Sequence, residues 1–488
     1  MADTITGQFA DKILAVRYED LPPAAVDMAR QVALDGIGVI LAGSTEPLGV
    51  GRISIEYVRS LGGAPQASVM AGGFKTSMTD AAYANGTMGH ALDFDNTWYP
   101  LNHPTSPTLP AILAIAEHHG LPGRKIVEAI VAAFEVQARV RLAATGLETG
   151  AGFHKPGTTG TFGAVAGAAK MLDLDRHQLL MALGLGGSRA GSISINTGSM
   201  TKSSHSGHAA RMGVECALLA QLGWTASADV FGPKGFFDTF FQGNAKPELL
   251  VEGFGAPYRM VSPGVGFKKY PSNYFTHRPI DAALALREEA KLDPATIQRV
   301  TVNFPRFDYV NRPQPESGLD GKFSVQYTAA IALLDGEVTI DSFTNERRFA
   351  ADVVALLPKV ELRVDDSIPS DFDRTHTVVE VELAGGRKVS KRVDRLTGWM
   401  GIPLTREQRL KKFHACTRRV LGEKSASRVL ELVEKLETLP DVIELMDLVR
   451  CDARRRRRPP RAAKRTRVRA ARAGSPRARA GRRARPDR

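Results

Sequence analysis

The chain has 488 residues, 43% of them hydrophobic, which is enough for two or three domains with buried cores. No apolar run approaches the ~18 residues of a membrane span, and the N-terminus lacks a charged-then-apolar leader, so we expect neither a membrane segment nor a secretion signal. The three cysteines, Cys216, Cys416 and Cys451, lie far apart. This spacing argues against a disulfide framework and favours a reducing, cytoplasmic compartment.

The formal net charge of +13 comes from the C-terminus alone. Residues 452–488 contain 17 Lys or Arg against two Asp, which leaves residues 1–451 with a formal charge of −2. With almost no large apolar residue, the Arg-rich tail (451–488) is expected to be disordered. We interpret it as an extension without a role of its own; the alternative is a segment that binds nucleic acid through phosphate contacts.

Most of the first 260 residues predict helices rich in Gly and Ala. Apolar spacing indicates a helix over 24–43, and further helices follow at 79–93, 106–120, 123–144, 160–174 and 208–223. We expect Thr79 or Asp80 to cap the second of these helices, Ser106 to cap the third, and Gly120 to end it. The many small residues predict closely approaching helix axes in a broad bundle.

The pattern changes near Pro263. Strands are predicted at 297–305, 359–366, 376–383 and 387–393, the last two forming a hairpin, with a helix at 324–336 among them. Helices return at 405–422 and 425–449. The sequence therefore predicts a mainly α protein with an α+β insert: a helical domain made of 1–265 and 399–450, and a smaller α+β domain at 266–398.

Histidines gather in turns rich in Gly, Ser and Thr that adjoin helices, where binding sites usually form. They are His90 and His103 around "LDFDNTWYPLNHPTSPT", His154 in "GFHKPGTTG", His205 and His208 in "TKSSHSGHAAR", and His277 in "KKYPSNYFTH". Lysines accompany all of these turns except the first: Lys155, Lys202, Lys268 and Lys269.

Asp93 ends the helix at 79–93, where the macrodipole favours cations. We therefore expect its ionised form to be disfavoured, as in a carboxyl tuned for acid or base work. Asp95 and Asn96 are interpreted as Asx-turn residues that break the helix. His103 precedes the next helix start, so an anion bound there would meet imidazole and free backbone amides together.

A metal site is the alternative for this stretch, because His90, Asp93, Asp95 and His103 are ligand types. Their spacing matches no zinc or EF-hand pattern, and we expect no metal. Several cations that converge with neutral hydrogen-bond donors suit a small polycarboxylate instead. Removal of a proton from carbon beside a carboxylate builds up negative charge that such cations stabilise, with His, Asp or Tyr as base and acid.

Six ordered motifs between residues 5 and 450 resemble the MmgE/PrpD family, which includes 2-methylcitrate dehydratase and cis-aconitate decarboxylase. They are "NGTMGHALDFDNT", "HPTSPTLPAILAIAEHHG", "GFHKPGTTGTFGAVAGAAKML", "MTKSSHSGHAARMGVECALLA", "KKYPSNYFTH" and "KFSVQYTAAIALLDG". The resemblance implies a large all-helical domain built from both ends of the chain, a smaller α+β lid and a homodimer. It implies no metal or organic cofactor.

The resemblance also implies site residues. By analogy with the decarboxylase branch, the active site lies at Asp93, Thr97, His103, His154, Lys202, Lys268 and Tyr327. The lysines and His103 would hold carboxylates, with Thr97, His205 and His277 as further binding residues. His154 or Asp93 would move protons, and Tyr327, in the lid, would close over the ligand.

One residue departs from the decarboxylase pattern. Asn273 stands where the animal decarboxylase has a histidine, and an amide is no general acid at neutral pH. The leading hypothesis is therefore a cofactor-independent hydro-lyase of the 2-methylcitrate dehydratase type, as in propionate metabolism. The alternatives are a cis-aconitate decarboxylase-like carboxy-lyase and a carboxylate epimerase, and, in a different class, a polyanion-binding protein acting through the tail.

Overall fold

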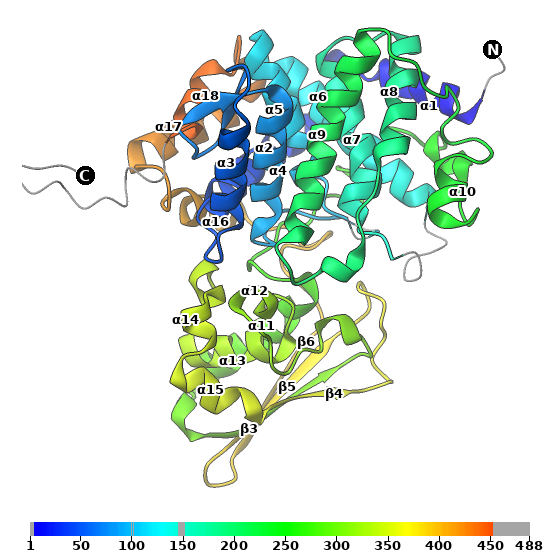
Figure 1. The fold of residues 1–488 in the computed structure, drawn as a ribbon. Helices are drawn as coiled ribbons and strands as arrows, with labels where there is room; N and C mark the ends of the chain where they lie inside the picture. The colour runs from blue at the N-terminus through cyan, green and yellow to red at the C-terminus, as the bar shows by residue number, and fades with distance from the viewer. Residues whose placement is uncertain (1–3, 99, 101, 145–151, 452–488) are drawn as a thin grey trace, which may run out of the picture. The chain divides into compact units, whose positions relative to one another are not determined.

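Long helices packed side by side make up the first part of the chain in the computed structural model, which describes residues 4–98, 100, 102–144 and 152–451 (Figure 1). These helices are α1 (Ile5–Ala15), α2 (Pro23–Gly43), α3 (Val50–Leu61), α4 (Met78–Ala91), α5 (Thr105–His119), α6 (Gly123–Ala143), α7 (Lys155–Met171), α8 (Arg176–Arg189), α9 (Thr201–Gln221) and α10 (Phe236–Phe241). Two short antiparallel strands, β1 (Ala67–Val69) and β2 (Phe74–Thr76), lie between α3 and α4.

The small residues on these helices allow the close approach that the sequence predicts. A Cβ atom on Gly207 of α9 would lie 2.1 Å from the Thr87 hydroxyl and 2.4 Å from the Tyr83 carbonyl oxygen of α4. Real Cβ atoms do not come so close, so only glycine permits this contact at position 207. The contact fixes α4 against α9, and both helices lead into the site described below.

The expected helix caps are wrong by a few residues. Helix α4 begins at Met78, and its N-cap is Ser77, whose side chain accepts from the Asp80 amide. Helix α5 begins at Thr105 without a side-chain cap, so the Ser106 hydroxyl is available for another partner. Gly120 ends α5 in the left-handed conformation, with φ of 60°, as predicted.

The second part of the chain combines a sheet with shorter helices. The strands are β3 (Ile297–Phe304), β4 (Val360–Val364), β5 (Thr377–Leu383) and β6 (Lys388–Val393), in the order β4-β3-β5-β6. Strand β3 pairs parallel with β4 and antiparallel with β5, and β5 and β6 form the predicted hairpin. The helices are α11 (His277–Glu289), α12 (Gly318–Gly321), α13 (Val325–Asp335), α14 (Asn345–Arg348) and α15 (Ala351–Leu356).

The last helices of the chain pack against helices of its first part. Helices α16 (Arg406–Thr417) and α17 (Glu423–Glu434) pack against α2, and α18 (Ile443–Val449) follows (Figure 1). One buried cluster accordingly draws residues from Phe9 to Phe267 and from Leu404 to Val449, and a second runs from Tyr270 to Trp399.

The coarse fold class is confirmed: the protein is mainly helical with small sheets. The domain boundaries at 265 and 398 stay a prediction, because residues up to Ala453 form one compact unit. Within the described part of the chain, none of the helices has the length and apolar character needed to cross a bilayer. Cys216 and Cys416 are buried free thiols. The Arg-rich tail beyond Cys451 lies outside the described residues.

Candidate active site

A turn after α4 carries the first groups of the site. The helix ends at Ala91, and Asp93 takes a left-handed conformation, with φ of 49°, that lets the chain leave the helix axis. Four residues further, the Thr97 amide donates to the Gly266 carbonyl at 2.9 Å, and the Gly266 amide donates to the Thr97 carbonyl at 2.7 Å. This bridge brings Lys268 beside Asp93, although 175 residues separate them.

Asp93 lies between two buried lysines. The Lys268 ammonium donates to Oδ2 and to the main-chain oxygen of Asp93, both at 2.8 Å, and Lys202 of α9 pairs with Oδ1. Burial alone raises the pKa of the Asp93 carboxyl, but Lys202 and Lys268 outweigh burial and hold this pKa well below its ordinary value. The expectation that the ionised form is disfavoured is therefore wrong, because two ammonium groups oppose the helix macrodipole.

Asp95 joins two imidazoles to α5. Its carboxylate lies 3.0 Å from Nδ1 of His90 and 3.3 Å from Nδ1 of His103, and it accepts from the Ser106 hydroxyl at 2.6 Å. Burial raises the pKa of Asp95, yet the nearby His103 and His90 bring it well below its ordinary value. The interpretation of Asp95 as a residue that merely breaks the helix is therefore wrong: the carboxylate orients the His103 ring.

A second pair of imidazoles lies at the start of α7. Nδ1 of His154, the N-cap residue, is 3.0 Å from Nδ1 of His205 on α9. Burial, followed by the Lys202 charge, holds the pKa of His154 well below 6.5 and lowers that of His205 to about 4. Both rings are then neutral near pH 7, so one Nδ1 donates to the other and the Nε2 atoms have fixed, opposite roles.

Some of these groups line one cavity of about 370 Å³, a size typical of small-molecule sites, whereas His90, Asp95 and His205 lie outside its lining. Six of the nine residues predicted for the site line it, and they are Asp93, Thr97, His103, His154, Lys202 and Lys268. The remaining lining residues include hydroxyl, amide and aromatic side chains: Asn102, Lys155, Pro156, Ser194, Thr197, Asn273, Tyr274, Phe275, Phe307 and Tyr309.

Three predicted residues do not line the cavity. His205 contacts His154, with the two Nδ1 atoms 3.0 Å apart, but does not itself line the cavity. His277 is buried with its ring stacked on Tyr274 at 4.6 Å, and burial holds its pKa well below 6.5. Tyr327 is fully buried in the first turn of α13, and its hydroxyl donates to the Ser342 carbonyl at 2.5 Å. We therefore correct the expectation that Tyr327 closes over a ligand: α13 packs into the second buried cluster, which draws Tyr327 away from the cavity.

Tyr309 and Asn102 are the main lining residues that the sequence did not single out. Tyr309 lies in a short turn, Asp308–Val310, that no chemical motif marks. Asn102 donates to the Thr159 hydroxyl at 2.7 Å and accepts from the His103 amide, so it fixes the backbone at His103. The sequence feature that could have identified Asn102 is its position directly before His103. Asn273, which the sequence did single out, accepts from the Phe275 amide at 3.0 Å and so turns its oxygen to the backbone.

His90, Asp95 and His103 are the one group among the described residues whose ligand atoms, within 4.8 Å of one another, could hold a metal ion. In each histidine Nδ1 faces the Asp95 carboxylate, whereas the buried Nε2 of His90 has no hydrogen-bond partner among the described residues. The expectation that the site needs no metal stays a prediction.

Comparison with known proteins identifies relatives over nearly the whole chain. Family models of the MmgE/PrpD N-terminal and C-terminal domains match residues 7–248 and 270–438. Cis-aconitate decarboxylases of Mus musculus and Homo sapiens are each 31% identical, over 92% of this chain and 94% and 95% of their own lengths. A 2-methylcitrate dehydratase of Salmonella typhimurium is 25% identical over 73% of this chain and 77% of its own.

These relatives are lyases of two kinds, carboxy-lyases and a hydro-lyase. The two family models cover both parts of the chain and all of the residues that line the cavity except Lys268, which lies between them. The protein belongs to the MmgE/PrpD family.

Proposed function

We propose that the protein is a cofactor-independent lyase that acts on a small di- or tricarboxylate in the cavity at Asp93. The observation that carries the proposal is the buried group of Lys202, Asp93 and Lys268, in which two ammonium groups share one carboxylate. The uncompensated positive charge suits a substrate with several carboxylates, and His103 adds a further hydrogen-bonding group at the same wall.

Substrate binding would turn Asp93 and His154 into useful bases. In the free protein, Lys202 and Lys268 keep the pKa of Asp93 low, and Lys202 also lowers that of His154. A substrate carboxylate that pairs with these lysines would neutralise part of their charge and so raise both pKa values toward neutrality. Either residue would then take a proton from carbon beside a carboxylate, and the lysines would stabilise the negative charge that develops there.

The leading candidate is a hydro-lyase of the 2-methylcitrate dehydratase type. Elimination of water breaks a C–H and a C–O bond and forms a C=C bond, so it needs a base for the proton and an acid for the departing hydroxyl. Decarboxylation releases carbon dioxide and needs no base. The pair of candidate bases, Asp93 and His154, therefore favours elimination.

A carboxy-lyase acting on cis-aconitate is the second candidate. The greater identity and coverage of the cis-aconitate decarboxylases favour it. Against it, the Asn273 amide stands where those relatives are expected to carry an acidic imidazole. An epimerase, which needs the same proton removal without a leaving group, and polyanion binding by the tail remain the other outcomes to test. A homodimer in the cytoplasm is part of the proposal.

The test is turnover of 2-methylcitrate, citrate and cis-aconitate by the purified full chain, with products followed by mass and the reaction repeated in D₂O. We expect net loss of water from a hydroxylated substrate, abolished in Asp93→Asn and unchanged when residues 452–488 are removed. Release of carbon dioxide alone would replace the hydro-lyase by the carboxy-lyase. Deuterium exchange without net product would indicate an epimerase. If the protein turns over none of these substrates and binds nucleic acid only while the tail is present, the proposal that it is an enzyme is refuted.

A further inference from the structure

Buried lysines donate hydrogen bonds to the backbone carbonyls of the segment that carries Asp93. The Lys322 ammonium donates to the Ala91 carbonyl at 3.0 Å, and Lys412 of α16 donates to the Phe94 carbonyl at 2.8 Å. Together with Lys268 on the Asp93 carbonyl, three cations hold the turn from outside its own chain segment. A turn that leaves a helix in the left-handed conformation cannot pair these carbonyls within the helix, so it needs such donors.

Lys412 is itself fixed by Asp35 of α2. Its ammonium lies 2.7 Å from Asp35 Oδ1 and 4.1 Å from the centre of the Phe94 ring, and both charged side chains are less than a tenth exposed. Asp35 Oδ2 also accepts from the Asn96 amide group at 3.4 Å. The Asp35–Lys412 pair therefore contacts the turn at Phe94 and at Asn96, on both sides of Asp95.

Asn96, which contacts Asp35, also contacts the His103 ring. The Asn96 carbonyl lies 3.2 Å from Nδ1 of His103, and the Asn96 side-chain oxygen accepts from Thr105 at 2.8 Å. Asp35 of α2 thus contacts the residue that contacts the His103 ring, although neither Asp35 nor Lys412 lines the cavity at Asp93.

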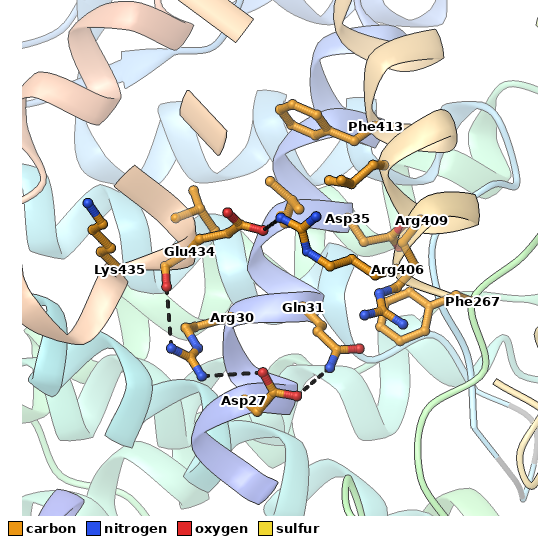
Figure 2. Close-up of a pocket in the computed structure, with 13 residues that line it drawn as sticks. Asp27, Arg30, Gln31, Asp35, Phe267, Arg406, Arg409, Phe413, Glu434 and Lys435 are labelled. Atoms are coloured by element: carbon orange, nitrogen blue, oxygen red, sulfur yellow. Dashed lines mark hydrogen bonds and ion pairs between the residues drawn. The ribbon is translucent and has the colours of Figure 1, made fainter. Parts of the chain in front are cut away.

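Figure 2 shows Asp35 at the wall of a different cavity. This cavity has a volume of about 470 Å³, and Asp35 borders it beside Arg409 and Phe413 of α16, with Gln31 one turn earlier on α2. Arg30 and Arg406, which line the same cavity, already pair with carboxylates, Arg30 with Asp27 and Glu437 and Arg406 with Glu434. Arg409 interacts with Asp35 through its charge but donates its hydrogen bond to the Leu404 carbonyl at 2.6 Å, and Lys412 is the cation with which Asp35 forms an ion pair.

A buried ion pair is weak evidence for stability, because removal of both charges from water costs about as much as their attraction returns. An apolar pair of similar size would pack the α2–α16 contact as well. The lysine does what an apolar residue cannot: it donates to the Phe94 carbonyl. We infer that Lys412, held by Asp35, is a positioning residue that sets the Asp93–Thr97 turn and the His103 ring for catalysis. This inference rests on the proposed function for its kinetic consequences.

The test compares Lys412→Met and the double variant Asp35→Leu/Lys412→Met with Lys411→Met, the neighbouring lysine, which is exposed on the same helix. We expect kcat to fall about 10- to 100-fold in both variants with KM within threefold, because the lysines that bind substrate stay in place. The double variant leaves no unpaired buried charge, so its melting temperature should be at least that of Lys412→Met. Lys411→Met should match the parent protein.

Hydrogen exchange decides the inference independently of any substrate. The Asp93 and Thr97 amides donate to the His90 and Gly266 carbonyls, and loosening of the turn exposes them. We expect exchange over residues 92–98 to speed up at least tenfold in Lys412→Met and in the double variant, and not in Lys411→Met. Unchanged exchange, or a kcat loss that only follows loss of stability, would overturn the positioning role. Faster exchange in a protein that turns over no carboxylate would refute the proposed function and leave the positioning of the turn intact.

Discussion

Two ammonium groups and one carboxylate meet at Asp93, so each substitution there changes the charge of the cavity wall. Lys268 and Lys269 are neighbours with different partners: Lys268 pairs with Asp93, and Lys269 pairs with Asp281 at 2.7 Å. Sequence position alone therefore does not show which of the two neighbouring lysines contacts Asp93 in the site. The pairing makes them a matched set for experiment.

Substitution of Lys268 by Met should weaken binding of a tricarboxylate such as citrate at least tenfold, because one of the two buried cations is lost. Loss of one hydrogen-bonded charge pair of this kind corresponds to about 1.4 kcal/mol or more. Titration calorimetry at pH 7 measures the effect. Lys269→Met should change affinity less than threefold. Equal losses in the two variants would show that general surface charge, rather than the Asp93 pair, attracts the ligand.

The pH dependence of kcat/KM tests the two candidate bases together. The pKa of His154 lies well below 6.5 and that of Asp93 well below 3.8, so the acid limb of the profile should fall below pH 6.5. Lys202 lowers both pKa values, so Lys202→Met should move the acid limb to higher pH, whichever residue is the base. A limb at or above pH 6.5 in the parent protein, or one that Lys202→Met leaves unchanged, would contradict both assignments.

At the scale of elements, the contact between α4 and α9 decides whether Asp93 can meet Lys202. Asp93 follows the last turn of α4, whereas Lys202 and His205 lie in the first turns of α9. Gly207 lets the two helices touch, because its position has no room for a side chain beside Thr87 and Tyr83. Gly207, in "TKSSHSGHAAR", is therefore required for packing, whereas Lys202 and His205 in the same motif contribute chemical groups to the site.

Gly207→Ala should separate α4 from α9 and lower both stability and activity. Overpacking of this kind costs about 1–3 kcal/mol, and a small displacement of Lys202 from Asp93 should reduce kcat/KM at least tenfold. Urea unfolding and steady-state kinetics measure the two effects. Gly191→Ala is the control, because a Cβ there meets nothing within 4 Å. Similar losses in both variants would remove the special role of the α4–α9 contact.

At the scale of the molecule, local patterns predicted the elements well and the contacts between them only in part. Strand β3, the β5–β6 hairpin and α13 lie where alternation and turn residues placed them, because those signals are local. Tyr309 and Tyr327 show the limit. Both are aromatic residues of the second part of the chain, but Tyr327 is buried in the second cluster whereas Tyr309 lines the cavity, and no local pattern separates the two.

The same limit applies to Asp93 and Asp95. The sequence placed both near a helix end, but their partners come from α9, from α5 and from the segment after Gly266. Ionisation depends on those long-range contacts more than on the helix dipole, which acts only within a turn. Charge state in a buried site is therefore the property that sequence spacing predicts least well.

Several buried histidines should make the stability of the whole molecule depend on pH. His90, His154, His205 and His277 are all less basic in the folded protein than the ordinary 6.5, with His90 and His205 near a pKa of 4. Burial is the largest cause of the lowered pKa of each of these histidines. Between pH 6.5 and about 4 the unfolded chain therefore binds more protons than the native protein, so the free energy of unfolding falls as pH falls through this window.

Urea unfolding at pH 7, 6 and 5 should show this loss, and His90, with a folded pKa of about 4, should contribute about 2 kcal/mol of it between pH 6.5 and 5. The lowered pKa values of Asp93 and Asp95 act only below pH 3.8, outside the window. His277→Gln, which removes one such group away from the cavity, should reduce the slope between pH 7 and 5. His414→Gln, at an exposed position on α16, should leave the slope unchanged. A stability that is flat from pH 7 to 5 would mean that the folded and unfolded chains bind the same number of protons in this range, and the lowered pKa values of the buried imidazoles would be contradicted.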